Sequence, residues 1–149
     1  MPANSAKEIS ELHDPKTIVC QLFEAFSALD IAQAMEFIDE DCVYKNVPFH
    51  TAHGKSRIAR DIGNLIKRID SFEIEVINIA ANDNVVLTER IDSLGGRFFK
   101  AALPLMGTFV IKNGKITEWR DYFDWSSTMG KVGRSLLTLP FKPLTKSGK

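Results

Sequence analysis

The sequence predicts an α+β fold in which helices come first and a run of antiparallel strands follows. Apolar residues recur at helical spacing through much of 14–69, whereas residues 72–124 alternate between apolar and polar side chains. Turn signals separate the alternating segments, and the longest segment contains residues that bend a strand. We therefore expect a cone-shaped, strongly bent antiparallel sheet with the N-terminal helices packed over its open side.

Three helices are expected before the long strands. Asp14 can cap a first helix, with Pro15 at its first position, and that helix runs to about Ala28. Asp30 can cap a short second helix that leads into an acidic connection at 39–41. A third helix is expected over 54–69. The apolar residues on the inner faces of the three are Ile18, Val19, Leu22, Phe23, Phe26 and Leu29, then Ala34, Met35, Phe37 and Ile38, then Ile58, Ile62, Leu65, Ile66 and Ile69.

The expected strands begin with a short one at 42–47, which ends at Pro48. Four longer strands follow, at 72–81, 85–94, 97–111 and 115–124. Turns are expected at 82–84, at Gly95-Gly96 and at Asn113-Gly114, the last being the strongest hairpin signal in the chain. Pro104 and Gly107 lie inside the third of the long strands and indicate a bulge or an edge position.

The 149 residues suit one domain, flanked by two segments of different character. We expect residues 1–13 to be a flexible N-terminal segment, 14–124 the single α+β domain, and 125–149 a basic C-terminal helix and tail. Residues 125–149 hold five basic side chains and no acidic one, and prolines at 140 and 143 end the expected helix at 126–139. A solvated tail explains this charge, and a weak contact with a membrane surface or an anionic partner is the alternative.

Composition excludes several classes of function. Lys plus Arg and Asp plus Glu both number 19, so no basic excess attracts a nucleic acid. No apolar run is long enough for a membrane span, and the N-terminus lacks the apolar core of a secretory signal. Cys20 and Cys42 are isolated from each other, and each lies in an apolar segment. This is typical of buried free thiols in a reduced compartment. We therefore expect a cytoplasmic protein without a nucleic-acid partner.

Three places with polar residues stand out when strand alternation is used to ask which face each side chain takes. In the last strand Asp121 shares a face with Trp119 and Phe123, where a carboxylate would be desolvated and its pKa raised unless it is paired. The alternative is that Asp121 lies on the outer surface. Because both flanking residues are large and apolar, we favour the buried position.

The other two positions lie in earlier strands. Arg90 and Asp92 share a face with Val86 and Thr88; they could form a surface ion pair, or Arg90 could reach inward and bridge two carboxylates with its planar guanidinium. Tyr44 and Asn46 share a face with Cys42; this could be a polar outer face, or both could hold a water molecule in an apolar space.

Taken together, the inward set would contain two carboxylates, one arginine, one tyrosine and one asparagine. Two carboxylates in an apolar cavity can take different protonation states, one acting as an acid and one as a base. Such a set suits the addition of water to a neutral, apolar electrophile. The residues alone do not assign which aspartate is the acid.

No other motif competes with this set. His50 and His53 are spaced H-x-x-H in an expected loop, without a carboxylate at metal-ligand spacing, so we expect no metal. Neither a phosphate-binding glycine loop nor a nucleophilic serine elbow is present, and we expect no cofactor.

Three segments resemble those of the limonene-1,2-epoxide hydrolase family: residues 43–48, 87–92 and 114–124. The third, with W-R-D-Y-F-D at 119–124 after a hairpin turn, is the most specific, and the resemblance extends over residues 14–124. It implies a fold like that of nuclear transport factor 2 and ketosteroid isomerase, and a homodimer. It also implies hydrolysis of an epoxide in one step, without a cofactor or a covalent ester.

The resemblance also implies a role for each polar residue. Asp121 would be the base that deprotonates water, Asp92 the acid that protonates the epoxide oxygen, and Arg90 the bridge between them. Tyr44 and Asn46 would hold the water beside the base. The partners are then water and a small apolar epoxide, either cyclic or terpene-like. By apolar character and strand parity, the residues expected to line the substrate cavity are Met35, Leu65, Leu103, Leu105, Trp119 and Phe123.

The stretch at 49–54 differs from the terpene-epoxide type, so we do not expect limonene oxide to be the natural substrate. Two other functions stay open on the same fold: an isomerase like ketosteroid isomerase, and a non-catalytic module that binds a small molecule. Arg90 between two aspartates argues against the isomerase, because a cation there would hold both carboxylates ionised. A binding module has little reason to keep two carboxylates and an arginine in apolar surroundings.

Overall fold

The computed structural model describes residues 14–124, and the expectations for 1–13 and 125–149 lie outside that range. The described part is an α+β fold in which the expected helices and strands occur in the expected order, with one additional strand. The elements are α2 (Pro15–Ser27), α3 (Ile31–Glu36), β1 (Ile38–Val47), β2 (His50–His53), α4 (Lys55–Ile66), β3 (Ser71–Asn82), β4 (Val85–Gly96), β5 (Phe99–Lys112) and β6 (Lys115–Phe123). None of the helices in this range is long and apolar enough to cross a bilayer.

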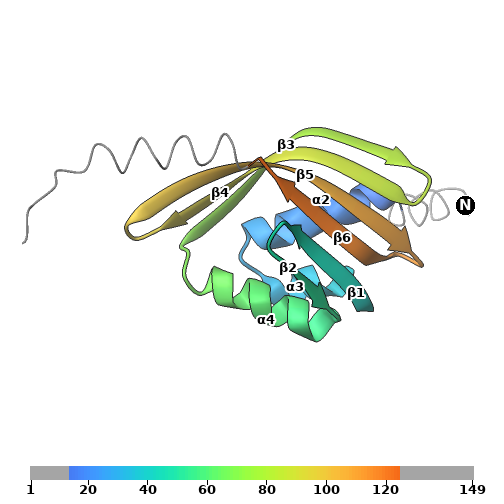
Figure 1. Cartoon of the computed structure of the whole chain (residues 1–149), viewed down its shortest axis with the longest axis horizontal. Helices are drawn as coiled ribbons and strands as arrows, with labels where there is room; N and C mark the ends of the chain where they lie inside the picture. The colour runs from blue at the N-terminus through green and yellow to red at the C-terminus, as the bar shows by residue number, and fades with distance from the viewer. Residues whose placement is uncertain (1–13, 125–149) are drawn as a thin grey trace, which may run out of the picture.

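The strands form one curved sheet in the order β2-β1-β6-β5-β4-β3, and the helices lie on its inner side (Figure 1). The cone-shaped α+β fold expected from the sequence is confirmed. One feature was not expected: β1 pairs with β6 in parallel, so the sheet is mixed, while its other pairs are antiparallel. This pairing brings Asn46 opposite Asp121 and Tyr44 opposite Trp119.

Two expected boundaries around β1 are wrong. The short helix ends at Glu36 and the strand begins at Ile38, so the acidic residues at 39–41 belong to β1. Ile38 is buried and pairs with Ile116 of β6, and this pairing extends the strand past the acidic residues, whose side chains are partly or fully exposed. Residues 50–53, expected to form a loop, form β2, because their backbone pairs with β1.

The expected helix caps are confirmed for the first two helices. The Asp14 side chain accepts a hydrogen bond from the Thr17 backbone N–H at 3.1 Å, and Pro15 occupies the first helical position. The Asp30 side chain accepts from the Gln33 N–H at 2.9 Å. These caps satisfy N–H groups that a helix start leaves without partners.

The core lies between the helices and the inner face of the sheet. Phe23 and Phe26 of α2 pack against Phe109 and Trp119 of the sheet, with ring centroids 5.6 and 5.7 Å apart. Alternation along β4 buries its even-numbered residues from Val86 to Asp92. The same rule that builds the core therefore turns the polar side chains of β4 inward.

Candidate active site

A cavity of about 100 Å³ lies between the helices and the inner face of the sheet, which is several times the space that one water molecule needs. All five polar residues singled out in the sequence line it: Tyr44, Asn46, Arg90, Asp92 and Asp121. The apolar lining residues are Phe23, Phe26, Ile62, Leu65, Phe72, Ile74, Leu94, Leu103, Trp119 and Phe123.

Four of the six apolar residues expected at the cavity are found there: Leu65, Leu103, Trp119 and Phe123. The expectation is wrong for Met35 and Leu105, which are buried but are not part of the lining. Strand or helix parity assigns a residue to the inner face, but the packing around it decides whether it meets other side chains or open space. Met35 belongs to the packed core.

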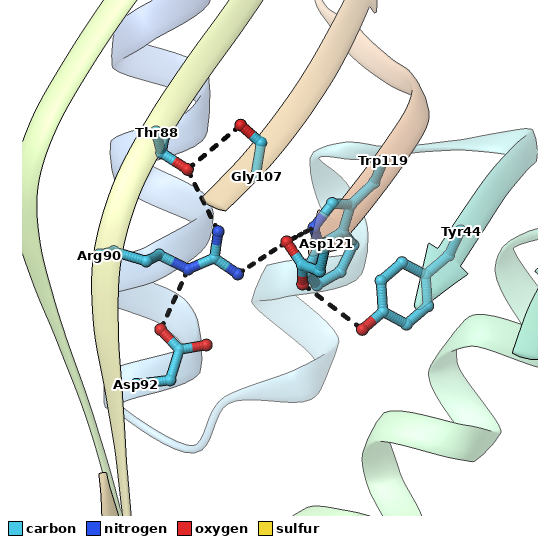
Figure 2. A network of polar contacts seen from close by, with 7 residues as sticks. All are labelled: Tyr44, Thr88, Arg90, Asp92, Gly107, Trp119 and Asp121. Atoms are coloured by element: carbon cyan, nitrogen blue, oxygen red, sulfur yellow. Dashed lines mark hydrogen bonds and ion pairs between the residues drawn. The ribbon is translucent and has the colours of Figure 1, made fainter. Parts of the chain in front are cut away.

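Arg90 lies between the two carboxylates, and its side chain is only 1% exposed (Figure 2). Its Nε donates to Asp92 Oδ1 at 3.0 Å, and its Nη2 donates to Asp121 Oδ1 at 2.9 Å. The guanidinium also lies 4.9 Å from the centre of the Phe23 ring. Burial acts to lower the pKa of Arg90, but the two carboxylates outweigh it and hold that pKa above its ordinary value, so the side chain stays cationic.

Asp121 is also buried, and it accepts more hydrogen bonds than Asp92 does. Besides Arg90, the Trp119 indole N–H donates to its Oδ1 at 2.9 Å, and the Tyr44 hydroxyl donates to its Oδ2 at 3.5 Å. Burial raises the pKa of Asp121 above its ordinary value, although Arg90, Trp119 and Tyr44 all act to lower it. Burial also raises the pKa of Tyr44 well above its usual range, so this hydroxyl stays protonated and available as a donor.

Asp92 accepts fewer hydrogen bonds than Asp121 does. Among the residues that the structure describes, Arg90 is its one side-chain donor. Burial raises the pKa of Asp92 to about 6, helped by the negative Asp121 and opposed by Arg90. Two ionised carboxylates around one cation would leave a net negative charge in an apolar site. Because Asp121 has three side-chain donors and Asp92 has one, hydrogen bonding favours the ionised form more strongly at Asp121 than at Asp92.

Asn46 completes the set from the edge of the cavity. It lies opposite Asp121 across the parallel pair of β1 and β6. Its Oδ1 is buried and accepts no hydrogen bond from a residue in 14–124. An acceptor in that position is free to bind a small donor in the cavity, such as a water molecule.

The two histidines singled out in the sequence lie outside this cluster. Both are in β2, and the ring of His50 contacts Tyr44 edge-on, with centroids 6.4 Å apart. His50 Nε2 also lies 3.5 Å from a carboxylate oxygen of Asp61. Among the residues that the structure describes, no group of three or more His, Cys, Asp or Glu side chains is placed to hold a metal ion.

Solved structures of low sequence identity share this fold. One is an NTF2-like protein of unknown function from Cytophaga hutchinsonii, 17% identical, with a TM-score of 0.66 over 78% of this chain and 95% of that chain. Another is a putative SnoaL-like polyketide cyclase from Shewanella denitrificans, 15% identical, with a TM-score of 0.72 over 81% of this chain and 97% of that chain. The molecule is therefore of the NTF2-like class, a fold that does not by itself fix a function.

More similar relatives define the family within that class. The family model of the limonene-1,2-epoxide hydrolase catalytic domain matches residues 13–134. The epoxide hydrolase EphG of Mycobacterium tuberculosis is 34% identical over 116 residues, which are 78% of this chain and 74% of that protein. A solved structure of an M. tuberculosis LEH-like epoxide hydrolase is 31% identical, with a TM-score of 0.73 over 82% of this chain and 91% of that chain. The chain belongs to the limonene-1,2-epoxide hydrolase family and is an enzyme of the epoxide hydrolase class.

Proposed function

We propose that the protein adds water directly to a neutral, apolar epoxide to give a vicinal diol. The observation that carries this proposal is the buried Arg90 between Asp121 and Asp92. Asp121 takes a proton from water, whose oxygen attacks an epoxide carbon. As the carbon–oxygen bond of the ring breaks, Asp92 gives its proton to the epoxide oxygen. Asp121 is then protonated and Asp92 ionised, so one proton must pass back before the next turnover.

The position of the reacting water follows from the free hydrogen-bonding groups. Asp121 Oδ1 is occupied by Arg90 and Trp119, so Oδ2, on the Tyr44 side, is the oxygen that can act as a base. Asn46 Oδ1 can accept the second proton of the same water. The Tyr44 hydroxyl has one proton, so when water is present it would donate to the water oxygen in place of Asp121 Oδ2. A water held in this way has a lone pair left for the epoxide carbon.

The character of the lining supports a neutral substrate with a hydrocarbon body. The walls are leucine, isoleucine and aromatic side chains, and the ionisable groups gather at Arg90. A charged substituent would be desolvated in such a cavity without a partner. We therefore propose a cyclic or terpene-like epoxide. The mechanism uses a proton donor, a proton acceptor and water, and calls for no cofactor.

The test is turnover of a panel of cyclic and terpene epoxides by the wild type and two isosteric variants. Asp121→Asn and Asp92→Asn should each reduce kcat by about 10²–10⁴-fold, because each removes a proton-transfer group. Glu118→Gln is the matched control. Glu118 lies in β6, as Asp121 does, and its carboxylate contacts Lys45 and Arg120 outside the cavity. This substitution should leave kcat unchanged.

Two results would contradict the proposal. Wild-type rates in either aspartate variant would remove that residue from the mechanism. Isomerisation of a β,γ-unsaturated ketone, with no epoxide hydrolysed, would favour an isomerase on the same fold.

A further inference from the structure

Gly107 of β5 lies directly beside the Arg90 guanidinium, although it does not line the cavity (Figure 2). A Cβ atom at this position would lie 2.4 Å from Arg90 Nη1, 2.8 Å from Thr88 Oγ1 and 3.0 Å from Asp121 Oδ1. The backbone of Gly107 does not have the positive φ that favours glycine. Glycine at this position therefore allows three polar groups to approach the backbone closely. It is not needed for an unusual backbone conformation.

Thr88 of β4 binds Nη1 of Arg90, the guanidinium nitrogen that donates to neither carboxylate. Arg90 Nη1 donates to Thr88 Oγ1 at 3.2 Å, and the Thr88 hydroxyl donates to the Gly107 carbonyl at 3.5 Å. Because the single hydroxyl proton points to that carbonyl, a lone pair is left facing Nη1. Thr88 is buried and does not line the cavity.

We propose that Thr88 and Gly107 are positioning residues for the reaction, a guanidinium seat that fixes Arg90 between Asp92 and Asp121. Three nitrogens of the guanidinium have three fixed partners: Nε has Asp92, Nη1 has Thr88 and Nη2 has Asp121. The Phe23 ring lies 4.9 Å from its central carbon. With Nη1 held, the planar group cannot turn without breaking a bond to one of the carboxylates. This proposal rests on the function proposed above.

The seat has a consequence for the base. The ionisable groups that face Asp121 are Arg90 and Asp92 from β4 and Tyr44 from β1. Arg90 is the only cation among these three, so moving it away raises the pKa of Asp121. Asp121 must be ionised to act as a base. A displaced guanidinium therefore moves the acid limb of the pH–rate profile to higher pH.

The kinetic test uses the full chain with two pairs of variants. Gly107→Ala should lower kcat by about 10–100-fold, leave KM unchanged and shift the acid limb of the profile upward. Gly63→Ala is its control, since a Cβ atom there would meet nothing within 4 Å. Thr88→Val should change the rate and the profile in the same direction as Gly107→Ala. Thr88→Ser keeps the hydroxyl and should restore both.

Three results would overturn the seat. One is a wild-type rate and profile in folded Gly107→Ala. Another is a loss in Thr88→Ser equal to that in Thr88→Val, which would show that the effect does not depend on the hydroxyl. The third is a rise in KM with an unshifted profile. Should Gly107→Ala fail to fold, the two Thr88 variants decide the question.

A measurement without substrate separates this proposal from the proposed function. The carboxyl ¹³C shift of Asp121 can be titrated in the wild type and in the Thr88 and Gly107 variants. A higher pKa of Asp121 in Gly107→Ala and Thr88→Val, and not in Thr88→Ser, supports the seat even if no epoxide is hydrolysed. An unchanged titration in the folded variants contradicts the seat even if epoxides are hydrolysed.

Discussion

At the residue scale, the site contains one buried cation, Arg90, paired with two buried carboxylates, Asp92 and Asp121. Arg90 is enclosed by Asp92, Asp121 and Thr88, so its charge is compensated without water. Holding one proton makes the cluster neutral, which reduces the cost of burying it. The donors around Asp121 favour its ionised form, and in the mechanism proposed above Asp92 holds the proton and acts as the acid.

This assignment predicts the pH dependence of the rate. The acid must carry its proton, and the pKa of Asp92 is about 6 because burial outweighs the attraction of Arg90. The value of kcat/KM for a neutral epoxide should therefore fall as pH rises above about 6, and it should also fall at low pH as Asp121 becomes protonated. A kcat/KM that rises steadily from pH 5 to 8 would contradict the assignment.

The same raised pKa predicts a pH dependence of stability. In the unfolded chain Asp92 ionises near its ordinary pKa of about 4, whereas in the folded protein it keeps its proton up to about pH 6. Stability from this group is thus fully present below pH 4 and is lost as pH rises through 6.

The measurement is the free energy of unfolding of the wild type and of Asp92→Asn from pH 4 to 8, by denaturant titration. The stability of the wild type relative to the variant should fall across this window, by at most about 3 kcal/mol. A constant difference between the two proteins would show that the folded-state pKa of Asp92 is not raised.

At the element scale, two packing arrangements assemble the site. The parallel pairing of β1 with β6 brings Asn46 beside Asp121, and α2 covers the cavity with Phe23 and Phe26. The N-cap of α2 is local and far along the helix from these rings. The cap should therefore contribute to stability and not to chemistry.

Asp14→Ala removes the side chain that accepts from the Thr17 N–H and from the Thr17 hydroxyl. It should lower the free energy of unfolding by about 0.5–2 kcal/mol, as measured by denaturant titration, with kcat unchanged. Asp14→Asn is the matched control, because asparagine caps a helix about as well. A large loss of kcat in folded Asp14→Ala would show that the start of α2 affects the site directly.

The elements also show how far the sequence can predict the site and why it stops there. Alternation in β6 indicated the inner face for Asp121, because strand parity is local. In β4 it put Arg90 and Asp92 on one face but left open whether they form a surface ion pair or point inward. The pairing of β1 with β6 depends on contacts between distant segments, so the position of Asn46 opposite Asp121 and the extra strand at 50–53 could not be read locally. For the same reason Phe23 and Phe26, which line the cavity, were not among the residues predicted to do so, and Met35 and Leu105 were predicted as lining but are not part of it.

At the scale of the whole molecule, the curved sheet has one face for the site and one face outside. The outer face carries large apolar side chains that are strongly exposed: Leu87 at 52%, Met106 at 59% and Tyr122 at 44%. Met106 and Tyr122 lie opposite each other on neighbouring strands. Exposed apolar patches of this kind mark contacts between proteins. We propose that this face joins two copies in the homodimer that the family resemblance implies.

Sedimentation measurements test this assembly. The wild type should sediment as a dimer, and Met106→Lys should shift it toward monomer, because a charge buried in an apolar interface has no partner. Lys112→Ala, at the exposed end of the same strand, is the control and should leave the dimer intact. A wild type that is monomeric at every concentration would contradict the proposal without affecting the site.

The central claim is that water attacks the epoxide directly, with Asp121 as its base. It is tested by a single turnover in H₂¹⁸O, with enzyme in excess over epoxide and mass analysis of the diol. The account predicts one ¹⁸O atom in the diol of this first turnover, the other oxygen coming from the epoxide. A first-turnover diol without ¹⁸O would mean that a carboxylate of the enzyme supplied the oxygen through an ester, and it would contradict the account.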